Sequence, residues 1–280
     1  MTVELGKLGV WTSYRVIGGD DAREAAKLVE SLGFGTFWLG GSPRLPDAGA
    51  LLEATDGLVA ATGIVNVWRY EPAQLAAEHV ELARAFPDRL LVGIGIGHPE
   101  ATSDYSRPLS TMRAFLDSLD AASPPLPRER RCLAALGPKM LALAAERSRG
   151  VLSYFVPLEH TRFIREQIGR APLLAVELAC VLDSDTERAR IAARNYARLY
   201  LGLRNYTNNL LRFGFSEGDI AGGGSDRLID AVIPHGTAAE VTDVARAHLE
   251  AGADHVCVQP VGLHGIPRNQ WTALAQELTG

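Results

Sequence analysis

The feature that most constrains the fold is a regular alternation of short apolar runs with longer segments of helical period. The runs that read as strands are 7–12, 35–40, 57–68, 89–97, 131–136, 151–156, 173–182 and 255–261. Segments between them, such as DDAREAAKLVESLG and TAAEVTDVARAHLEAG, repeat apolar residues every three or four positions and end at glycine. Strands joined by crossover helices run parallel. Eight such units in 280 residues predict an α/β fold, a single (β/α)8 TIM barrel, with a doubly wound parallel sheet as the alternative.

The alternation is not interrupted by a linker, so residues 1–280 are predicted to form one domain. The region 205–236 is predicted to be an insertion between the seventh and eighth strands. It contains the segment SDRLIDAVI, a short helix for which Ser225 and Asp226 are candidate N-caps. The glycines at 222–224 follow no strand and precede no phosphate-loop lysine, which favours a hinge or loop.

Charge and cysteine usage exclude several kinds of partner. The net charge is −5 and no basic run is longer than Arg128–Arg131, which argues against nucleic acid. No apolar stretch has the length of a membrane span or of a signal-peptide core, so a cytoplasmic location is expected. Cys132, Cys180 and Cys257 lie far apart in apolar runs without metal-ligand spacing, and are predicted to be buried thiols.

The reactive groups of a (β/α)8 barrel stand at the carboxyl ends of its strands. In this chain the strand ends carry aromatic, small and amide residues: Trp11, Gly40, Asn66, Gly97, Ala134, Ala135, Tyr154 and Gln259. They offer no pair of carboxylates, no lysine placed for a Schiff base and no metal cluster. This composition indicates that a bound organic cofactor supplies the reactivity toward a small-molecule substrate. Trp11, Ser42 and Trp68 are the candidates for the substrate pocket.

The run LLVGIGIGH (90–98) has glycine at alternate positions, 93, 95 and 97. Residues of a strand alternate between its two faces. If the branched residues fill the barrel, Gly93, Gly95 and Gly97 face the helices and His98 continues the inward row to the mouth. An imidazole there could exchange a proton with a substrate, which makes His98 the candidate catalytic residue. The alternative is that His98 bonds only the backbone of the following loop, PEATSDYSRP.

Three stretches carry a family resemblance: LGFGTFWLG, ATGIVNVWRYEPAQLAAEHVELARAFPDRLLVGIGIGH and LAALGPKMLALAAERSRGVLSYFVPLEHT. Together they resemble the luciferase-like monooxygenase superfamily, and within it the oxidoreductases that depend on the deazaflavin coenzyme F-420. The resemblance covers nearly the whole chain. It implies a barrel that holds the cofactor ring system at its mouth. It also implies a homodimer, to which the apolar segments PDAGALLEA and AQLAAEHVELARAF would contribute.

The resemblance assigns cofactor contacts position by position. It implies a non-proline cis peptide at Gly63–Ile64 beneath the ring. The other positions that it assigns to the cofactor are Asn66, Gly97, Ala134, Ala135, Tyr154 and Val156, with the helix start at Glu159, His160 and Thr161. Backbone N–H groups at that helix start would receive the cofactor phosphate. The chain departs from the family at WLGGS (38–42), where several F-420 enzymes have a histidine, and at His98, where the family can hold a glutamate.

These observations predict an oxidoreductase that transfers a hydride between coenzyme F-420 and an unidentified organic substrate. The alternatives are an FMN-dependent luciferase-like monooxygenase and a flavin- or deazaflavin-binding protein that does not turn over. The first strand is followed by GVWTSYRVIGG rather than by a GxGxxG sequence, which argues against a dinucleotide site.

Overall fold

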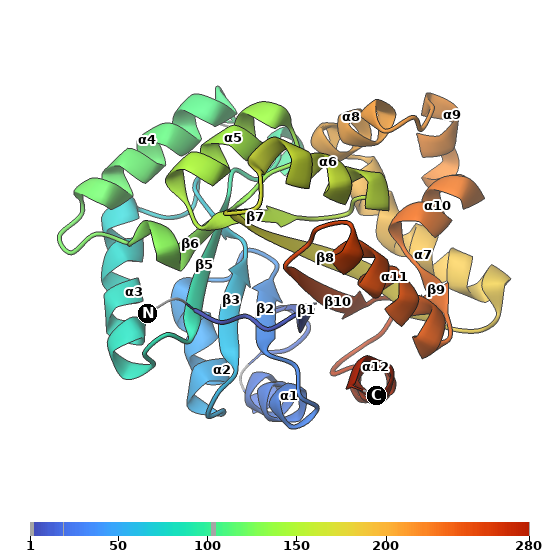
Figure 1. Ribbon diagram of the computed structural model, residues 1–280, viewed down its shortest axis with the longest axis horizontal. Helices are drawn as coiled ribbons and strands as arrows, with labels where there is room; N and C mark the ends of the chain where they lie inside the picture. The colour runs from blue at the N-terminus through green and yellow to red at the C-terminus, as the bar shows by residue number, and fades with distance from the viewer. Residues whose placement is uncertain (1–2, 19, 102–104, 280) are drawn as a thin grey trace.

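The structure is a computed structural model that describes residues 3–18, 20–101 and 105–279. Parallel strands form a closed barrel, which confirms the predicted TIM barrel and excludes the doubly wound sheet (Figure 1). Its strands are β1 (Leu8–Ser13), β2 (Thr36–Gly40), β3 (Val59–Gly63), β5 (Leu90–Gly95), β6 (Arg131–Ala134), β7 (Gly150–Ser153), β8 (Leu173–Leu182) and β10 (His255–Pro260). The barrel closes because β10 pairs with both β1 and β8.

Two short strands extend the barrel at its carboxyl end. β4 (Val65–Asn66) follows β3 and pairs with β5, and β9 (His235–Gly236) pairs with the end of β8. The helices are α1 (Asp20–Ser31), α2 (Gly49–Glu53), α3 (Pro72–Ala85), α4 (Pro108–Ala121), α5 (Pro138–Arg147), α6 (Leu158–Ile168), α7 (Thr186–Leu201), α8 (Arg204–Arg212), α9 (Glu217–Ile220), α10 (Asp226–Val232), α11 (Ala238–Glu250) and α12 (Arg268–Thr279). No helix among the described residues is long and apolar enough to cross a membrane.

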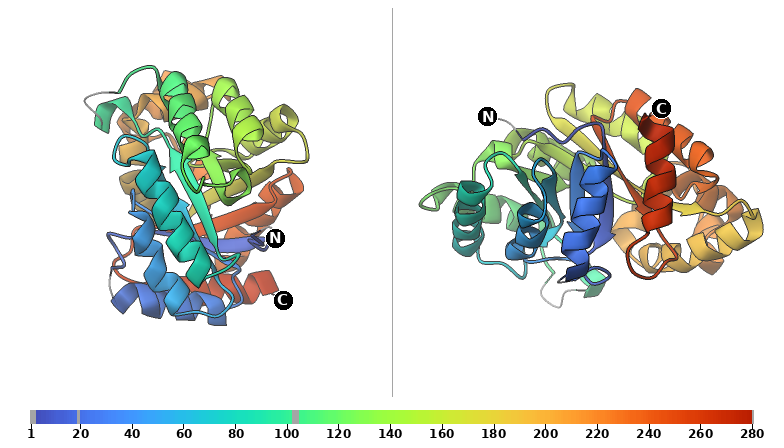
Figure 2. Two further views of the ribbon diagram at one scale, coloured as in Figure 1. Left: turned by 90° about the vertical axis from the view of Figure 1, so that its left-hand side faces the viewer. Right: turned by 90° about the horizontal axis from the view of Figure 1, so that it is seen from below.

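The predicted insertion between the seventh and eighth barrel strands holds α8, α9, α10 and β9. Ser225 caps α10 as expected, because its side chain accepts a hydrogen bond from the backbone N–H of Leu228 at 3.2 Å. Gly222, Gly223 and Gly224 all have positive φ, so this loop uses a conformation that favours glycine. At the other end of the chain, α12 lies beside α1 on the outside of the barrel (Figure 2), where Arg268 pairs with Glu24.

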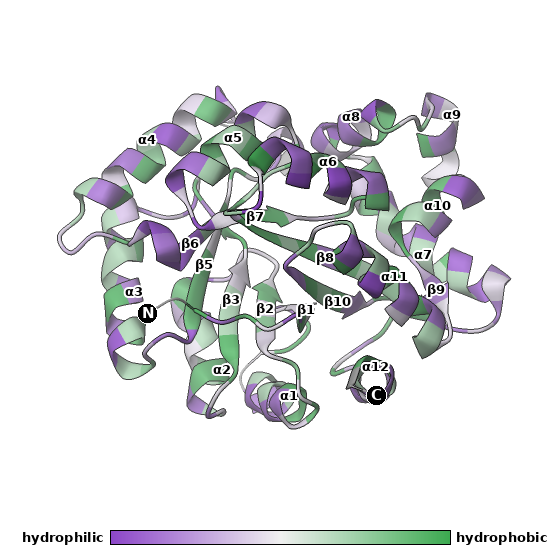
Figure 3. Ribbon diagram, in the orientation of Figure 1, coloured by the Kyte–Doolittle hydropathy of each residue, from purple (hydrophilic) through white to green (hydrophobic). Residues whose placement is uncertain are grey.

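Two apolar cores lie on opposite faces of the barrel strands. The inner core includes Trp11, Trp38, Leu91, Cys132 and Cys257, and the outer core joins strand residues to the helices. Figure 3 shows the strands as the most hydrophobic part of the chain, while the surrounding helices alternate hydrophobic and hydrophilic residues. All three cysteines are buried and free, as predicted.

The predicted orientation of the glycine-rich strand is wrong. Val92 and Ile94 belong to the outer core, whereas Leu91 belongs to the inner one, so Gly93 and Gly95 face the barrel interior. The reason is volume, because two buried tryptophans, Trp11 and Trp38, already occupy the interior. A β-carbon on Gly93 would lie 1.9 Å from the backbone oxygen of Thr62 in β3.

Gly93→Ala is therefore expected to lower the free energy of unfolding by about 3 kcal/mol, because β3 and β5 must separate to admit the methyl group. Gly49→Ala is the matched control. Gly49 is helical and buried, and its added β-carbon would meet only Leu82 Cδ2 at an ordinary 3.5 Å. It should raise stability by about 0.4–1 kcal/mol. Urea unfolding of both variants measures the difference, and equal effects would contradict the inward orientation of Gly93.

Candidate active site

The carboxyl ends of the strands bring part of the predicted site together. The floor of this mouth is formed by half-exposed residues of neighbouring strands: Gly63, Ile64, Asn66, Gly97, His98, Ala134 and Tyr154. The peptide bond Gly63–Ile64 is cis, as the resemblance implies. Ala135 is buried behind this floor, and Val156 is only 2% exposed.

Trp11 forms one wall of the mouth. A β-carbon on Gly40 would lie 1.7 Å from Trp11 Cζ2, and one on Gly63 would lie 2.5 Å from Trp11 Nε1. Glycine at both positions therefore leaves room for the indole ring. The Nε1–H group of Trp11 is buried, and the part of the chain that the structure describes gives it no hydrogen-bond acceptor. A buried donor without an acceptor costs about 1–3 kcal/mol, so this group marks a place where a bound molecule would be stabilised.

Asn66 and Trp68 join the ends of β4 and β5. Asn66 Oδ1 accepts a hydrogen bond from the backbone N–H of Trp68 at 3.0 Å, and Trp68 Nε1 donates to the backbone oxygen of Ile96 at 2.6 Å. A β-carbon on Gly97 would lie 2.8 Å from Asn66 Nδ2. Asn66 thus occupies the space beside Gly97, and Trp68 is half-exposed at the rim.

Two residues other than glycine have left-handed backbone at strand ends that border the mouth. Ser42, after β2, has φ 59°, and Phe155, after β7, has φ 54°. Such conformations cost about 1–3 kcal/mol each and cluster at functional sites. Their positions at two strand ends support placing the site at this mouth.

His98 lies at the mouth, but it does not continue the inward row of a strand. β5 ends at Gly95 and Gly97 has φ 66°, so the strand alternation does not reach His98. Its Nδ1 lies 2.9 Å from Asn205 Oδ1, and its ring centroid lies 5.4 Å from that of Tyr206. Both partners belong to α8, so these contacts of His98 come from the insertion. Residues 102–104 of the loop that follows His98 lie outside the described residues.

Electrostatics favour a neutral His98. Burial lowers the pKa of the imidazole, although the hydrogen bond to Asn205 and the charge of Glu100 act in the other direction. Because the carbonyl oxygen of Asn205 can only accept, Nδ1 carries the hydrogen and Nε2 carries the lone pair. His98 is thereby set up to accept a proton at Nε2.

Tyrosines beside Trp11 form a second wall of the mouth, with the ring centroids of Trp11 and Tyr154 5.4 Å apart. Tyr154 was a predicted cofactor contact, whereas Tyr196 and Tyr200 were not among the predicted residues. The hydroxyl of Tyr154 hydrogen-bonds to those of Tyr196 and Tyr200, the latter at 2.9 Å. Tyr154 and Tyr196 each donate to Gln259 Oε1 at 3.0 Å. Burial raises the pKa of each of these tyrosines, so the hydroxyls are neutral donors. A signal existed in the sequence, because Tyr196 and Tyr200 are four residues apart and so share a helix face.

The predicted phosphate site is only partly available. α6 begins at Leu158, as the resemblance implies, and the side chain of Glu159 is exposed. The side chains of His160 and Thr161 are buried and engaged elsewhere, His160 Nε2 with the backbone oxygen of Leu136 at 3.0 Å and Thr161 Oγ1 with His248 Nδ1 at 2.8 Å. Only the backbone of the first turn remains for an anion.

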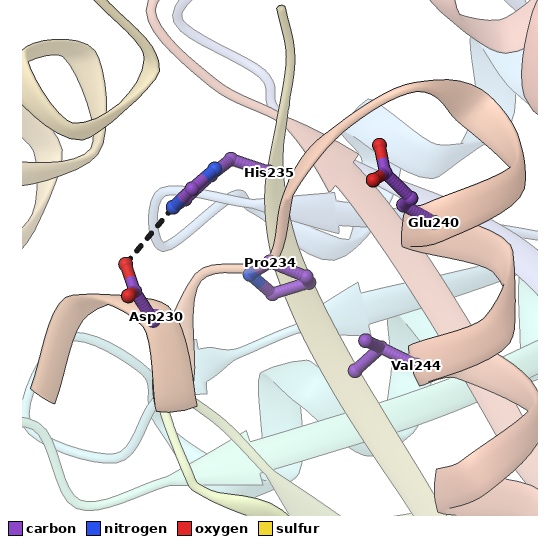
Figure 4. A pocket seen from close by; sticks show the side chains of 5 residues that line it. All are labelled: Asp230, Pro234, His235, Glu240 and Val244. Atoms are coloured by element: carbon purple, nitrogen blue, oxygen red, sulfur yellow. Dashed lines mark hydrogen bonds and ion pairs between the residues drawn. The ribbon is translucent and has the colours of Figure 1, made fainter. Parts of the chain in front are cut away.

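Neither of two surface cavities contains a predicted site residue. One, of about 260 Å³, lies between β9, α10 and α11 and is lined by Asp230, Pro234, His235, Glu240 and Val244 (Figure 4). His235 Nε2 in this cavity lies 2.9 Å from Asp230 Oδ1. The other, of about 270 Å³, lies at the amino ends of the strands, where Arg149 and His255 line it. The residues that form the floor of the mouth are half-exposed and line neither cavity.

Comparisons with known proteins point to one family. A family model described as luciferase-like monooxygenase matches residues 2–255. An F-420-dependent secondary alcohol dehydrogenase, solved with an F-420–acetone adduct, is 16% identical over 99% of both chains, with a TM-score of 0.76. The coenzyme F-420-dependent tetrahydromethanopterin reductase of Methanopyrus kandleri is 16% identical over 99% of both chains, with a TM-score of 0.71. The oxygenating constituent of 3,6-diketocamphane monooxygenase of Pseudomonas putida, solved with FMN, is 16% identical over 96% of both chains, with a TM-score of 0.65.

Proposed function

The chain belongs to the luciferase-like monooxygenase family, and from this premise we propose that it is an oxidoreductase that transfers a hydride between coenzyme F-420 and a small organic substrate. The observation that carries the proposal is the mouth itself. It combines the small residues Gly63, Gly97 and Ala134 with a buried donor on Trp11 that has no acceptor within the described residues. The shifted pKa values of His98 and Tyr154 favour the neutral form of both side chains. Two solved structures of similar fold have names that include F-420.

The residues present fit a flat, uncharged ring system. Gly63, Ile64 and Ala134 would support the ring, and Trp11 Nε1 would donate a hydrogen bond to a ring oxygen. The backbone N–H groups at the start of α6 would hold a phosphate, since the helix N-terminus favours an anion. When bound, the deazaflavin supplies the hydride or accepts it.

This chain's own residues would manage the proton. His98 would take a proton from the substrate at Nε2, while Asn205 keeps the hydrogen on Nδ1 and fixes the ring orientation. The hydroxyl of Tyr154 would hold a polar atom of the substrate, and the aromatic side chains of Trp11 and Tyr206 would exclude water.

FMN is the second candidate cofactor. The family includes monooxygenases, and a structure of similar fold was solved with FMN. A binding protein without turnover is the third candidate, because WLGGS (38–42) has no histidine after β2. The homodimer stays a prediction, since the apolar residues of α2 and α3 that motivated it, such as Leu51 and Leu75, are buried within the chain.

Equilibrium titration with F-420, FMN and FAD tests the cofactor. We expect F-420 to bind more tightly than FMN, and we expect Trp11→Phe to weaken that binding about 3-fold to 10-fold by removing one hydrogen-bond donor. Trp271→Phe is the matched control, because Trp271 is fully buried in the outer core and its Nε1 also has no acceptor within the described residues. Protein that purifies with tightly held FMN and ignores F-420 would refute the proposal.

A further inference from the structure

Glu177 is the one charged residue in the strand sequence LLAVELACVL (173–182). It is 2% exposed and lies in β8, in register with Cys257 of the inner core. The register of β7 with β8 pairs Ser153 with Val176, so the next inward positions, Tyr154 and Glu177, are cross-strand neighbours. The carboxyl group therefore lies inside the barrel, directly beside the strand that carries Tyr154.

The contacts of Glu177 are few. Oε2 accepts a hydrogen bond from the backbone N–H of Phe155 at 3.3 Å, and Oε1 is buried with no partner among the described residues. Phe155 is the residue whose backbone turns left-handed where β7 ends. The side chain of Glu177 thus anchors the backbone just after the end of β7, next to Tyr154 at the mouth.

Within the part of the chain that the structure describes, no cation is among the groups that shift the pKa of this carboxyl group. The titratable groups that interact with it are Tyr154 just after β7, Tyr196 and Tyr200 of α7, Tyr206 of α8, Cys180 of β8 and Cys257 of β10. Burial raises the pKa of Glu177 to about 8, although the Phe155 N–H group opposes the shift. A buried carboxylate without a cation is costly, so the group is held as a neutral acid at neutral pH.

We propose that neutral Glu177 is a positioning residue of the mouth, which fixes the end of β7 and the hydroxyl of Tyr154, and that its ionisation loosens this wall. An ionised Glu177 needs more hydrogen-bond donors than the single N–H group of Phe155. Water or a tyrosine hydroxyl could provide them. If the hydroxyl of Tyr154 turned to donate to Glu177, its hydrogen bond to Gln259 would break. The proposal rests on the proposed location of the active site and not on the identity of the cofactor.

Infrared and near-ultraviolet circular dichroism spectra of the cofactor-free protein, recorded from about pH 6 to pH 9, test this role. Wild type should show the carbonyl stretch of a buried carboxylic acid, lost as the pH rises through about 8, together with a change in the aromatic dichroism. Glu177→Gln keeps an acceptor for Phe155 N–H and should show neither change, while retaining the low-pH aromatic spectrum of wild type. Glu166→Gln, which removes an exposed acid of α6, should behave like wild type.

Tyr154→Phe supplies a second comparison. It should keep the pH-dependent carbonyl stretch but lose most of the aromatic change, because the hydroxyl that moves is absent. An aromatic change of equal size in Glu177→Gln, or a wild type without the buried-acid stretch at neutral pH, would overturn the role of Glu177. These spectra are recorded without a cofactor. They therefore test the role of Glu177 even if the titration shows that the protein does not bind F-420.

Discussion

Replacing His98 with alanine should lower turnover by about 100-fold to 10,000-fold while leaving the fold intact, which is the usual contribution of a general acid or base. The expectation rests on the geometry of the imidazole. Nδ1 is committed to Asn205 Oδ1 at 2.9 Å, so Nε2 is the nitrogen left to accept a proton from a substrate. Single-turnover kinetics with F-420 and a panel of small organic substrates measure the loss of turnover, and thermal unfolding of the variant measures whether the fold is intact.

Asn205→Ala separates proton transfer from packing. It leaves the imidazole in place but removes the acceptor that keeps the hydrogen on Nδ1, so it should lower turnover by less than His98→Ala and shift its pH profile. Burial lowers the pKa of His98, so the rate of substrate oxidation should fall only below the ordinary pKa of histidine. If the His98→Ala variant turned over at the wild-type rate, His98 would have a structural role and not a catalytic one.

Lowering the pH from 7 to 5 should destabilise the protein by about 5 kcal/mol. Burial lowers the pKa of four histidines to about 4: His79, His160, His248 and His255. In the unfolded chain each has a pKa near 6.5, so between these values the unfolded state binds more protons and stability falls with falling pH. Each histidine contributes a loss of about 2 kcal/mol at pH 5.

Glu177 acts in the opposite sense. Its pKa is raised to about 8 in the folded protein, so between pH 7 and pH 5 the folded state binds more protons than the unfolded chain. The resulting gain in stability on acidification offsets a little more than one of the four histidines. Because small domains are stable by only about 5–15 kcal/mol, the net loss brings the protein close to unfolding at pH 5. Urea unfolding at the two pH values measures it, and a stability that is flat across this range would contradict the buried, neutral state of the histidines.

His79→Leu isolates one of the four contributions. His79 is 4% exposed in α3, and neither ring nitrogen has a hydrogen-bond partner among the described residues. Replacing such a group with an apolar side chain of similar size leaves no partner unsatisfied. The variant should be about 2 kcal/mol more stable than wild type at pH 5 and should lose this advantage, apart from any gain in apolar packing, near pH 7.

The strand–helix alternation was sufficient to predict the barrel, because parallel strands with crossover helices have few closed arrangements. The same sequence did not predict which face of β5 points inward. A run such as LLVGIGIG shows only that the two faces of the strand differ in side-chain size. Which face points inward depends on Trp11 and Trp38, which belong to other strands and fill the interior. That information is tertiary and does not lie within the run itself.

The site shows the same division. Residues placed by strand ends, such as Gly63 and Asn66, were predicted from the sequence and its resemblance and do lie at the mouth. The partners of His98 and Tyr154 come from α7 and α8, more than 40 residues farther along the chain, and no local pattern joins them. Glu177 was not predicted, because it lies within β8 rather than at a strand end and a lone acid in an apolar run does not by itself indicate a contact with the site.

The packing of Trp11 against Gly40 and Gly63 makes the three positions mutually dependent in evolution. A chain that first gains a side chain at either glycine passes through an intermediate in which that side chain overlaps the indole ring. Shrinking Trp11 first opens the space, so substitutions at this wall are accessible in one order and not in the other. Among descendants of this sequence, a smaller residue at position 11 should therefore precede any enlargement at 40 or 63, and the three should vary together.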